Sequence, residues 1–216
     1  GYTWLDNRAD AGVAAVSPLK MPRIGQVTTQ LGGVVSLSYF QSHPCNINNT
    51  SNIHRSDDCG VSFYANGGGG VGYFNRWKVQ QLSSADTFSG NATQTTNYAY
   101  STPAWHYADD PALPAGVHLW NDFRGSEVVT VTASSGAMTV QRFHRGMNGD
   151  RLNTAGGSYS AVVTLSDGVT RADDNWLAGQ PVEVRRLRSN GSALVRTVNW
   201  FVATLTAGSG VSGAYW

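Results

Sequence analysis

Three stretches of this sequence decide its fold: GQVTTQLGGVVSLSYF at 25–40, GSEVVTVTASSGAMTVQRF at 125–143 and GQPVEVRRLRSNGSALVRTVNWF at 179–201. Each runs from a glycine through an alternating, valine-rich segment to a turn that contains glycine, and then returns to an aromatic residue. The turns contain Gly32-Gly33, Ser135-Gly136 and Asn190-Gly191. Alternation with a period of two predicts strands, and a glycine turn between two strands predicts a β-hairpin. The repetition predicts a sheet extended by copying one unit.

The predicted fold class is all-β, with antiparallel hairpins stacked into an extended sheet, a sandwich or a shell-like strip. No stretch shows a sustained apolar period of 3.6 residues, so we expect very little helix. We expect a single β-rich domain over 1–216, with any subdivision near 103–124. Further strands are predicted at 76–83, 95–102 and 159–167. Loops are predicted at 42–60, 103–114, 144–153 and 171–176, and residues 1–22 are expected to be irregular.

The bulk composition excludes some classes of partner. Fifteen Lys and Arg against fourteen Asp and Glu give a net charge of +1, which argues against nucleic acid as the main partner. No run of apolar residues is long enough to span a membrane as a helix. The chain begins at Gly1 without an initiator Met, and we expect it to be part of a longer parent chain.

Two cysteines, Cys45 and Cys59, flank the polar segment CNINNTSNIHRSDDC. A disulfide is the favoured interpretation, and it places the chain in an oxidising, secreted setting. The alternative is a zinc site completed by His43 and His54. The spacing lacks the closely paired ligands of zinc modules, so the disulfide is preferred.

Candidate ligand-binding residues lie in three oxygen-rich or aromatic segments. The first contains an aromatic patch that flat sugars suit, beside two aspartates; the other two resemble loops that supply oxygen ligands to calcium. Turn formation by the same side chains is the structural alternative. The candidates are Trp105, His106, Tyr107, Asp109, Asp110, Asn148, Asp150, Asp173 and Asp174. We expect no cofactor other than calcium.

Catalysis is disfavoured by the motifs that the chain lacks. The nucleophile-elbow pattern G-x-S-x-G is absent, which argues against a serine hydrolase of that type. A glycosidase needs two carboxylates across a cleft, but Glu127 and Glu183 fall inside predicted strands, where we expect them to face solvent. The sequence therefore predicts a protein that is not an enzyme.

Several segments, in order along nearly the whole chain, resemble large secreted bacterial Rhs/YD-repeat proteins, in the region ahead of their tandem YD repeats. The segments are GYTWLDNRAD, MPRIGQVTTQLGG, QSHPC, the second cysteine, TPAWHYADDP, FHRGMNGDRL and DNWLAGQPVEVRRL. The resemblance implies a β-rich shell in which hairpins stack into a strip that encloses a cargo, often a toxin.

The chain departs from that family in two ways. The YD repeat itself does not appear, and neither does the self-cleaving core with its variable toxin tail, so protease and toxin activities are not carried over. The resemblance implies a non-catalytic structural segment whose partners are the remainder of the parent chain or its cargo. The alternative function is a carbohydrate- or cell-surface-binding β-domain that uses exposed Trp105 and Tyr107, with calcium on Asp109 or Asp110.

Overall fold

The computed structural model describes residues 1–6, 20–48, 53–64, 70–88, 90–109, 112, 118–203, 205–207 and 214–215. In this part of the chain the structure is all-β, as predicted, and helix is confined to the short 3-10 turn η2 at Asn175–Leu177. No helix of the described residues is long and apolar enough to cross a membrane.

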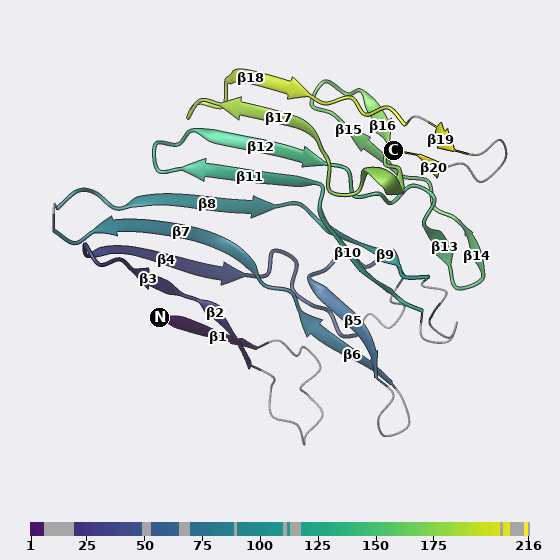
Figure 1. Ribbon diagram of the computed structural model, residues 1–216, viewed down its shortest axis with the longest axis horizontal. Helices are drawn as coiled ribbons and strands as arrows, with labels where there is room; N and C mark the ends of the chain where they lie inside the picture. Colours follow the sequence, from purple (N-terminus) through teal and green to yellow (C-terminus); the bar gives the residue numbers. More distant parts are fainter. Residues whose placement is uncertain are drawn as a thin grey trace.

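The dominant element is an eight-stranded antiparallel sheet with the order β18-β17-β12-β11-β8-β7-β4-β3 (Figure 1). Neighbours in the sheet are mostly neighbours in the sequence, because hairpins follow one another along it. Its strands are β3 (Gln26–Thr28), β4 (Gly33–Phe40), β7 (Lys78–Asp86), β8 (Gln94–Tyr100), β11 (Val128–Ala133), β12 (Met138–Phe143), β17 (Pro181–Leu187) and β18 (Ala193–Val198). The three hairpins predicted from sequence are β3–β4, β11–β12 and β17–β18.

Six two-stranded hairpins accompany the large sheet. Four of them, β5–β6, β9–β10, β13–β14 and β15–β16, lie beyond the same end of its strands in Figure 1. Their strands are β5 (Cys59–Tyr64), β6 (Gly70–Asn75), β9 (Pro103–Tyr107), β10 (Trp120–Ser126), β13 (Arg151–Asn153), β14 (Gly156–Ser158), β15 (Val162–Thr164) and β16 (Thr170–Ala172). The other two hairpins are β1 (Tyr2–Asp6) with β2 (Lys20–Ile24) and β19 (Leu205–Ala207) with β20 (Ala214–Tyr215).

One turn geometry is used four times. In each case a three-residue loop ends in a glycine with φ between 78° and 86°, and its backbone N–H bonds back to the carbonyl that precedes the loop. A non-glycine residue is strained at such a φ, so the glycine determines the turn and thereby the register of the hairpin. The four glycines are Gly32, Gly136, Gly168 and Gly191.

Several segments predicted to be loops contain strands. The segment 103–114, read as a loop because of its prolines and aspartates, contains β9, which pairs antiparallel with β10. Pro103 is the first residue of β9, where a missing N–H is tolerated, and Trp105 and Tyr107 alternate along it. The prediction of a loop there was wrong.

Smaller corrections follow the same pattern. The irregular 1–22 contains β1 and part of β2, the loop 171–176 contains most of β16 and the start of η2, and the loop 144–153 ends in β13. The strand predicted at 159–167 is reduced to β15. In each case the paired segment is short, and its partner supplies a pairing that local sequence does not reveal.

Most of the buried core lies in the hairpins beyond the strand ends, and within the large sheet β17 contributes to it through Val182 and Leu187. Trp105, Trp120, Val61 and Val163 are at most 3% exposed, and Val163 packs with Leu165 and Val182. By contrast, none of the residues in β4, β7, β8, β11 and β12 is fully buried. The fold is therefore densely packed at one end and open over much of the sheet.

Over β4, β7, β8 and β11, one face of the large sheet is mostly apolar. Register places Leu37 opposite Leu82, and Tyr98 and Tyr100 opposite Val131 and Val129. These side chains share a face because alternate residues of a strand point to the same side. We call the following set the apolar sheet face: Val35, Leu37, Tyr39, Leu82, Tyr98, Tyr100, Val129 and Val131. Partial burial raises the pKa of Tyr100, and neighbouring Tyr98 adds to that shift.

Candidate functional site

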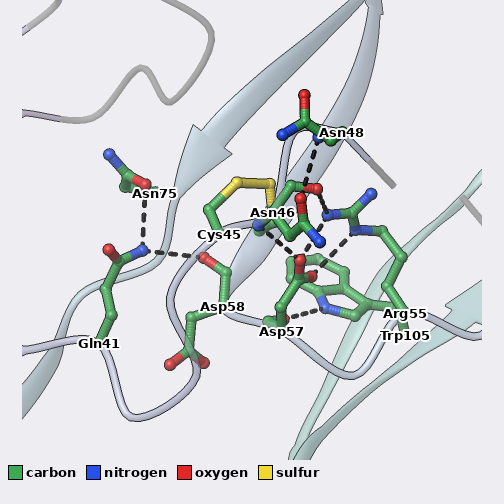
Figure 2. Close-up of a disulfide and its surroundings, with 10 residues drawn as sticks. Gln41, Cys45, Asn46, Asn48, Arg55, Asp57, Asp58, Asn75 and Trp105 are labelled. Carbon is green, nitrogen blue, oxygen red and sulfur yellow. Dashed lines mark hydrogen bonds and ion pairs between the residues drawn. A yellow bond between two sulfur atoms is a disulfide. The ribbon is translucent and has the colours of Figure 1, made fainter. Parts of the chain in front are cut away.

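The two cysteines form the predicted disulfide, with their Cα atoms 4.6 Å apart (Figure 2). The histidines of the zinc alternative face other groups. His43 Nε2 lies 3.5 Å from the hydroxyl of Thr102, and His54 Nδ1 lies 3.4 Å from a carboxylate oxygen of Asp150. The Cys45–Cys59 pairing therefore closes a polar loop and does not belong to a Cys2His2 site.

Inside this loop a buried arginine organises the backbone. Arg55, which is 2% exposed, binds both carboxylate oxygens of Asp57, at 3.0 Å from Nε and 2.5 Å from Nη2 (Figure 2). Asp57 also accepts the backbone N–H of Asn46 at 2.9 Å, and Arg55 donates to the carbonyl of Asn46. A bidentate pair of this kind holds both partners in one geometry, so the loop has a fixed shape.

Trp105 is part of this structure and not a surface for ligands. It is 2% exposed, and its indole N–H donates to the carbonyl of Asp57 at 2.9 Å (Figure 2). Its ring packs against Phe123, with centroids 4.8 Å apart, and the Arg76 guanidinium lies 3.9 Å from the centroid of Phe123. The exposed Trp105 that a stacking platform requires is absent, and the alternative built on it is wrong for this residue.

Asp58 is a second buried carboxylate at the loop. It is fully buried, forms an ion pair with Lys78 at 2.6 Å and accepts hydrogen bonds from the Ser42 hydroxyl and the His43 backbone N–H. Lys78 begins β7, so this pair ties the loop to the large sheet. Three donors compensate a charge whose burial alone is unfavourable.

Asp150 joins two histidines that lie far apart in the sequence. Its Oδ1 accepts the Tyr107 backbone N–H at 3.1 Å and lies 3.4 Å from His106 Nε2, while its Oδ2 faces His54. His106 Nδ1 lies 2.8 Å from the Tyr107 carbonyl, which only accepts, so that nitrogen carries a hydrogen. Two segments singled out from sequence, 105–107 and 148–150, thus meet at this carboxylate.

Asp173 is bound by the backbone of the loop 144–148. One of its oxygens accepts the N–H groups of Arg145 and Gly146 at 2.8 and 2.9 Å, and the other accepts that of Met147 at 3.2 Å. His144 Nδ1 lies 3.3 Å away, and both side chains are buried. Burial opposes ionisation of Asp173, but the bonds from His144 and the three N–H groups outweigh it and lower the pKa.

The neighbouring candidates complete a contact between two loops. Asp174 accepts the side-chain N–H of Asn148 at 2.8 Å, and the same two residues form an isolated parallel β-bridge. Asn148 also accepts the backbone N–H of Ala161 at 3.3 Å. The sequence placed Asn148, Asp150, Asp173 and Asp174 in one class of ligands, and the structure brings them together as loop-to-loop contacts.

These carboxylates do not converge on a calcium ion. Calcium takes six to eight oxygen ligands, whereas both oxygens of Asp173 and one oxygen each of Asp150 and Asp174 receive hydrogen bonds from the protein, and the second oxygen of Asp150 faces His54. Asp109 is exposed, and Asp110 lies outside the described residues. Within the described ranges, the one group of three acidic, histidine or cysteine ligands close enough for a metal is Cys45, Asp57 and Cys59, and its sulfurs are joined to each other.

The environments of two side chains, Glu183 and His54, were not predicted from the sequence. Glu183, expected to face solvent, is 2% exposed; it accepts the Ser166 hydroxyl at 2.6 Å and pairs with Arg196 and Arg142. These bonds lower its pKa against the opposing effect of burial. His54 was considered only as a zinc ligand, although its φ of 45°, uncommon outside glycine, fixes it beside Tyr159. Neither arrangement follows from local spacing, because the partners come from other hairpins.

Comparison with known proteins adds no relative. No protein-family model, no curated protein and no solved structure matches this chain. The resemblance to Rhs/YD-repeat proteins therefore stays a prediction.

Proposed function

We propose that this chain is a non-catalytic structural segment of a larger secreted Rhs/YD-type protein, in which it forms one strip of a β-rich shell that encloses or displays cargo. The observation that carries the proposal is the apolar sheet face. A face of valine, leucine and tyrosine side chains on the four strands β4, β7, β8 and β11, none of them fully buried, is half of a packed interface. Layers of this kind pack against a second sheet or a cargo.

The opposite face of the same strands supports this orientation. There Ser36, Gln81, Asn97 and Thr130 alternate with the apolar residues, and such a face tolerates water. A shell wall needs one polar face that contacts solvent and one apolar face that is buried. The alternation along β4, β7, β8 and β11 supplies both without a second layer from the described part of the chain.

The edge strand β18 supports extension of the sheet. It stands at the end of the strand order, and Leu194 and Val195 are each 52% exposed. An apolar edge with unpaired backbone groups is a template for another strand. In the proposed parent protein the next hairpin pairs with β18, and the sheet continues as a strip.

The proposal that the segment is not catalytic rests on the hydrogen bonds that the buried carboxylates accept. Asp58, Asp150, Asp173 and Glu183 are the buried carboxylates of the described residues, and each binds donors from distant segments. Stabilising the contacts between hairpins accounts for their burial.

Mass spectrometry of the natural protein tests the proposal. An antibody raised against this chain is used to isolate the native polypeptide from the culture medium and the cells of the source. We expect a secreted polypeptide much larger than 23.1 kDa whose peptides include tandem YD repeats. A native polypeptide of 23.1 kDa, or a larger one without those repeats, contradicts the assignment.

A further inference from the structure

A hollow of about 380 Å³ lies beside the side chains of Trp176 and Trp200. Its walls come from β16, from η2 and from the segment that follows β18. The residues used below are Arg171, Asp174, Trp176 and Trp200. The volume falls in the range of sites for small ligands, which is roughly 300–1,000 Å³.

Two indoles of this hollow are exposed. Trp176 is 49% and Trp200 71% exposed, whereas Trp105 and Trp120 in the core are at most 3% exposed. Packing therefore explains the core indoles and leaves these two without an equivalent role. Two exposed indoles that line one hollow suit a flat ligand with an apolar face, as a pyranose ring has.

Arg171 adds a positive charge without a counter-ion. Its guanidinium carbon lies 3.3 Å from the centroid of the Trp200 ring, and its buried Nε has no hydrogen-bond partner. No ion pair to a carboxylate of the described residues forms here, in contrast to Arg55, Arg142 and Arg196. A guanidinium that lies over an indole face keeps its Nη N–H groups, which lie in the guanidinium plane, available, and these match a carboxylate.

We propose that this hollow binds an acidic sugar, a pyranose that carries a carboxylate. The sugar ring stacks on Trp176, and its carboxylate takes the N–H groups of Arg171, which Trp200 holds in place. Asp174 accepts one bond from Asn148, so its remaining lone pairs accept sugar hydroxyls. The unpaired Arg171 distinguishes this site from one for neutral sugars, and the site does not depend on the proposed shell.

Calorimetry with two matched disaccharides tests the proposal: one ends in glucuronic acid and the other in glucose. We expect the acidic sugar to bind the 216-residue chain about tenfold to a hundredfold more tightly, as a charge-assisted bidentate bond implies. Arg171→Gln abolishes this preference, and Trp176→Ala weakens both sugars. Trp4→Ala is the matched control, because Trp4 is 64% exposed on β1, outside the hollow.

Circular dichroism and urea unfolding verify that each variant is folded, and a variant that is not folded is replaced by the uncharged Arg171→Met or by Trp176→Leu. Equal affinity for the two sugars, or no binding of glucuronic acid at millimolar concentration, overturns the proposal. A preference for the acidic sugar that survives Arg171→Gln also overturns it. An acidic peptide without sugar is the third probe, and binding of that peptide as tight as that of the sugar contradicts the ligand class.

Discussion

The molecule has two regions that differ in how their side chains are buried: the large sheet, and the hairpins β5–β6, β9–β10, β13–β14 and β15–β16, which we call the hairpin end. At the hairpin end, Trp105, Asp58, Asp150 and Asp173 are buried, and each is bonded to a segment far away in the sequence. In the sheet, four of the seven pairings join strands that are consecutive in the sequence, and none of the residues on the four strands that bear the apolar sheet face is fully buried. The first region buries its own side chains, whereas the second leaves an apolar surface partly exposed.

Removing the central indole tests the hairpin end most severely. Trp105→Ala leaves a cavity and an unpaired carbonyl on Asp57, and we expect a loss of about 3–5 kcal/mol in the free energy of unfolding. Urea unfolding followed by circular dichroism measures it. Trp4→Ala, at an exposed indole, is expected to change stability by about 0.5 kcal/mol or less. Similar losses for the two variants would mean that the core lies elsewhere.

Opening the disulfide comes next. Cys45 and Cys59 close a loop of about 15 residues, and we expect their replacement by serine to cost about 3 kcal/mol through the entropy of the unfolded chain. Reductant added to the unaltered protein is expected to lower the free energy of unfolding by the same amount. The double serine variant is the control, since it must be insensitive to reductant; an unaltered protein equally insensitive would show that the loop does not depend on the bond.

Asp173 gives a dependence on pH with a defined sign. Its pKa is lowered in the folded state, so the carboxylate contributes stability above its unfolded pKa of about 3.9, and this contribution is lost as pH falls through the folded pKa. Asp173→Asn is expected to cost about 1–3 kcal/mol at pH 7, because an amide cannot accept all three N–H groups.

The same variant is followed by urea unfolding from pH 7 to pH 3. The difference from the unaltered protein should narrow below about pH 4, where Asp173 takes up a proton in the unfolded chain before it does so in the folded protein. Asp109→Asn, at an exposed aspartate, is the matched control and should show no such narrowing. A constant difference across this range would remove Asp173 from the account of acid stability.

A pair of leucines compares the two regions directly. Leu165 is 4% exposed in the core, and Leu165→Ala is expected to cost about 2–5 kcal/mol. Leu82 lies on the apolar sheet face, and Leu82→Ala should cost about 1 kcal/mol or less in the isolated chain, since less area is withdrawn from water. Equal losses in urea unfolding would mean that a layer already covers this face.

The sequence predicted what local patterns determine. Glycine turns at Gly32, Gly136 and Gly191 and the alternation along β4 gave the hairpins and the apolar side of the strand, because turn chemistry and strand period are local. The Cys45–Cys59 pairing followed from spacing and composition.

What the sequence did not reveal depends on pairing between distant hairpins. Residues 103–107 look like a loop until β10 is placed beside them, and Trp105 looks exposed until Asp57 is seen to accept its N–H. Glu183 alternates as a solvent-facing residue would, yet Arg196 and Ser166 cover it. The exposed hollow at Arg171 was missed for the same reason, since β16 and the segment after β18 meet only in three dimensions.

Hydroxyl-radical footprinting of the apolar sheet face tests the central claim most directly. The 216-residue chain and the proposed longer parent protein are labelled side by side, and modification of Leu37, Leu82, Tyr98 and Tyr100 is quantified by mass spectrometry. The account predicts that these residues are labelled in the isolated chain and protected in the longer protein, while Trp105 is protected in both. Equal labelling of the four residues in the two proteins would contradict the claim that a second layer covers the apolar sheet face in the longer protein.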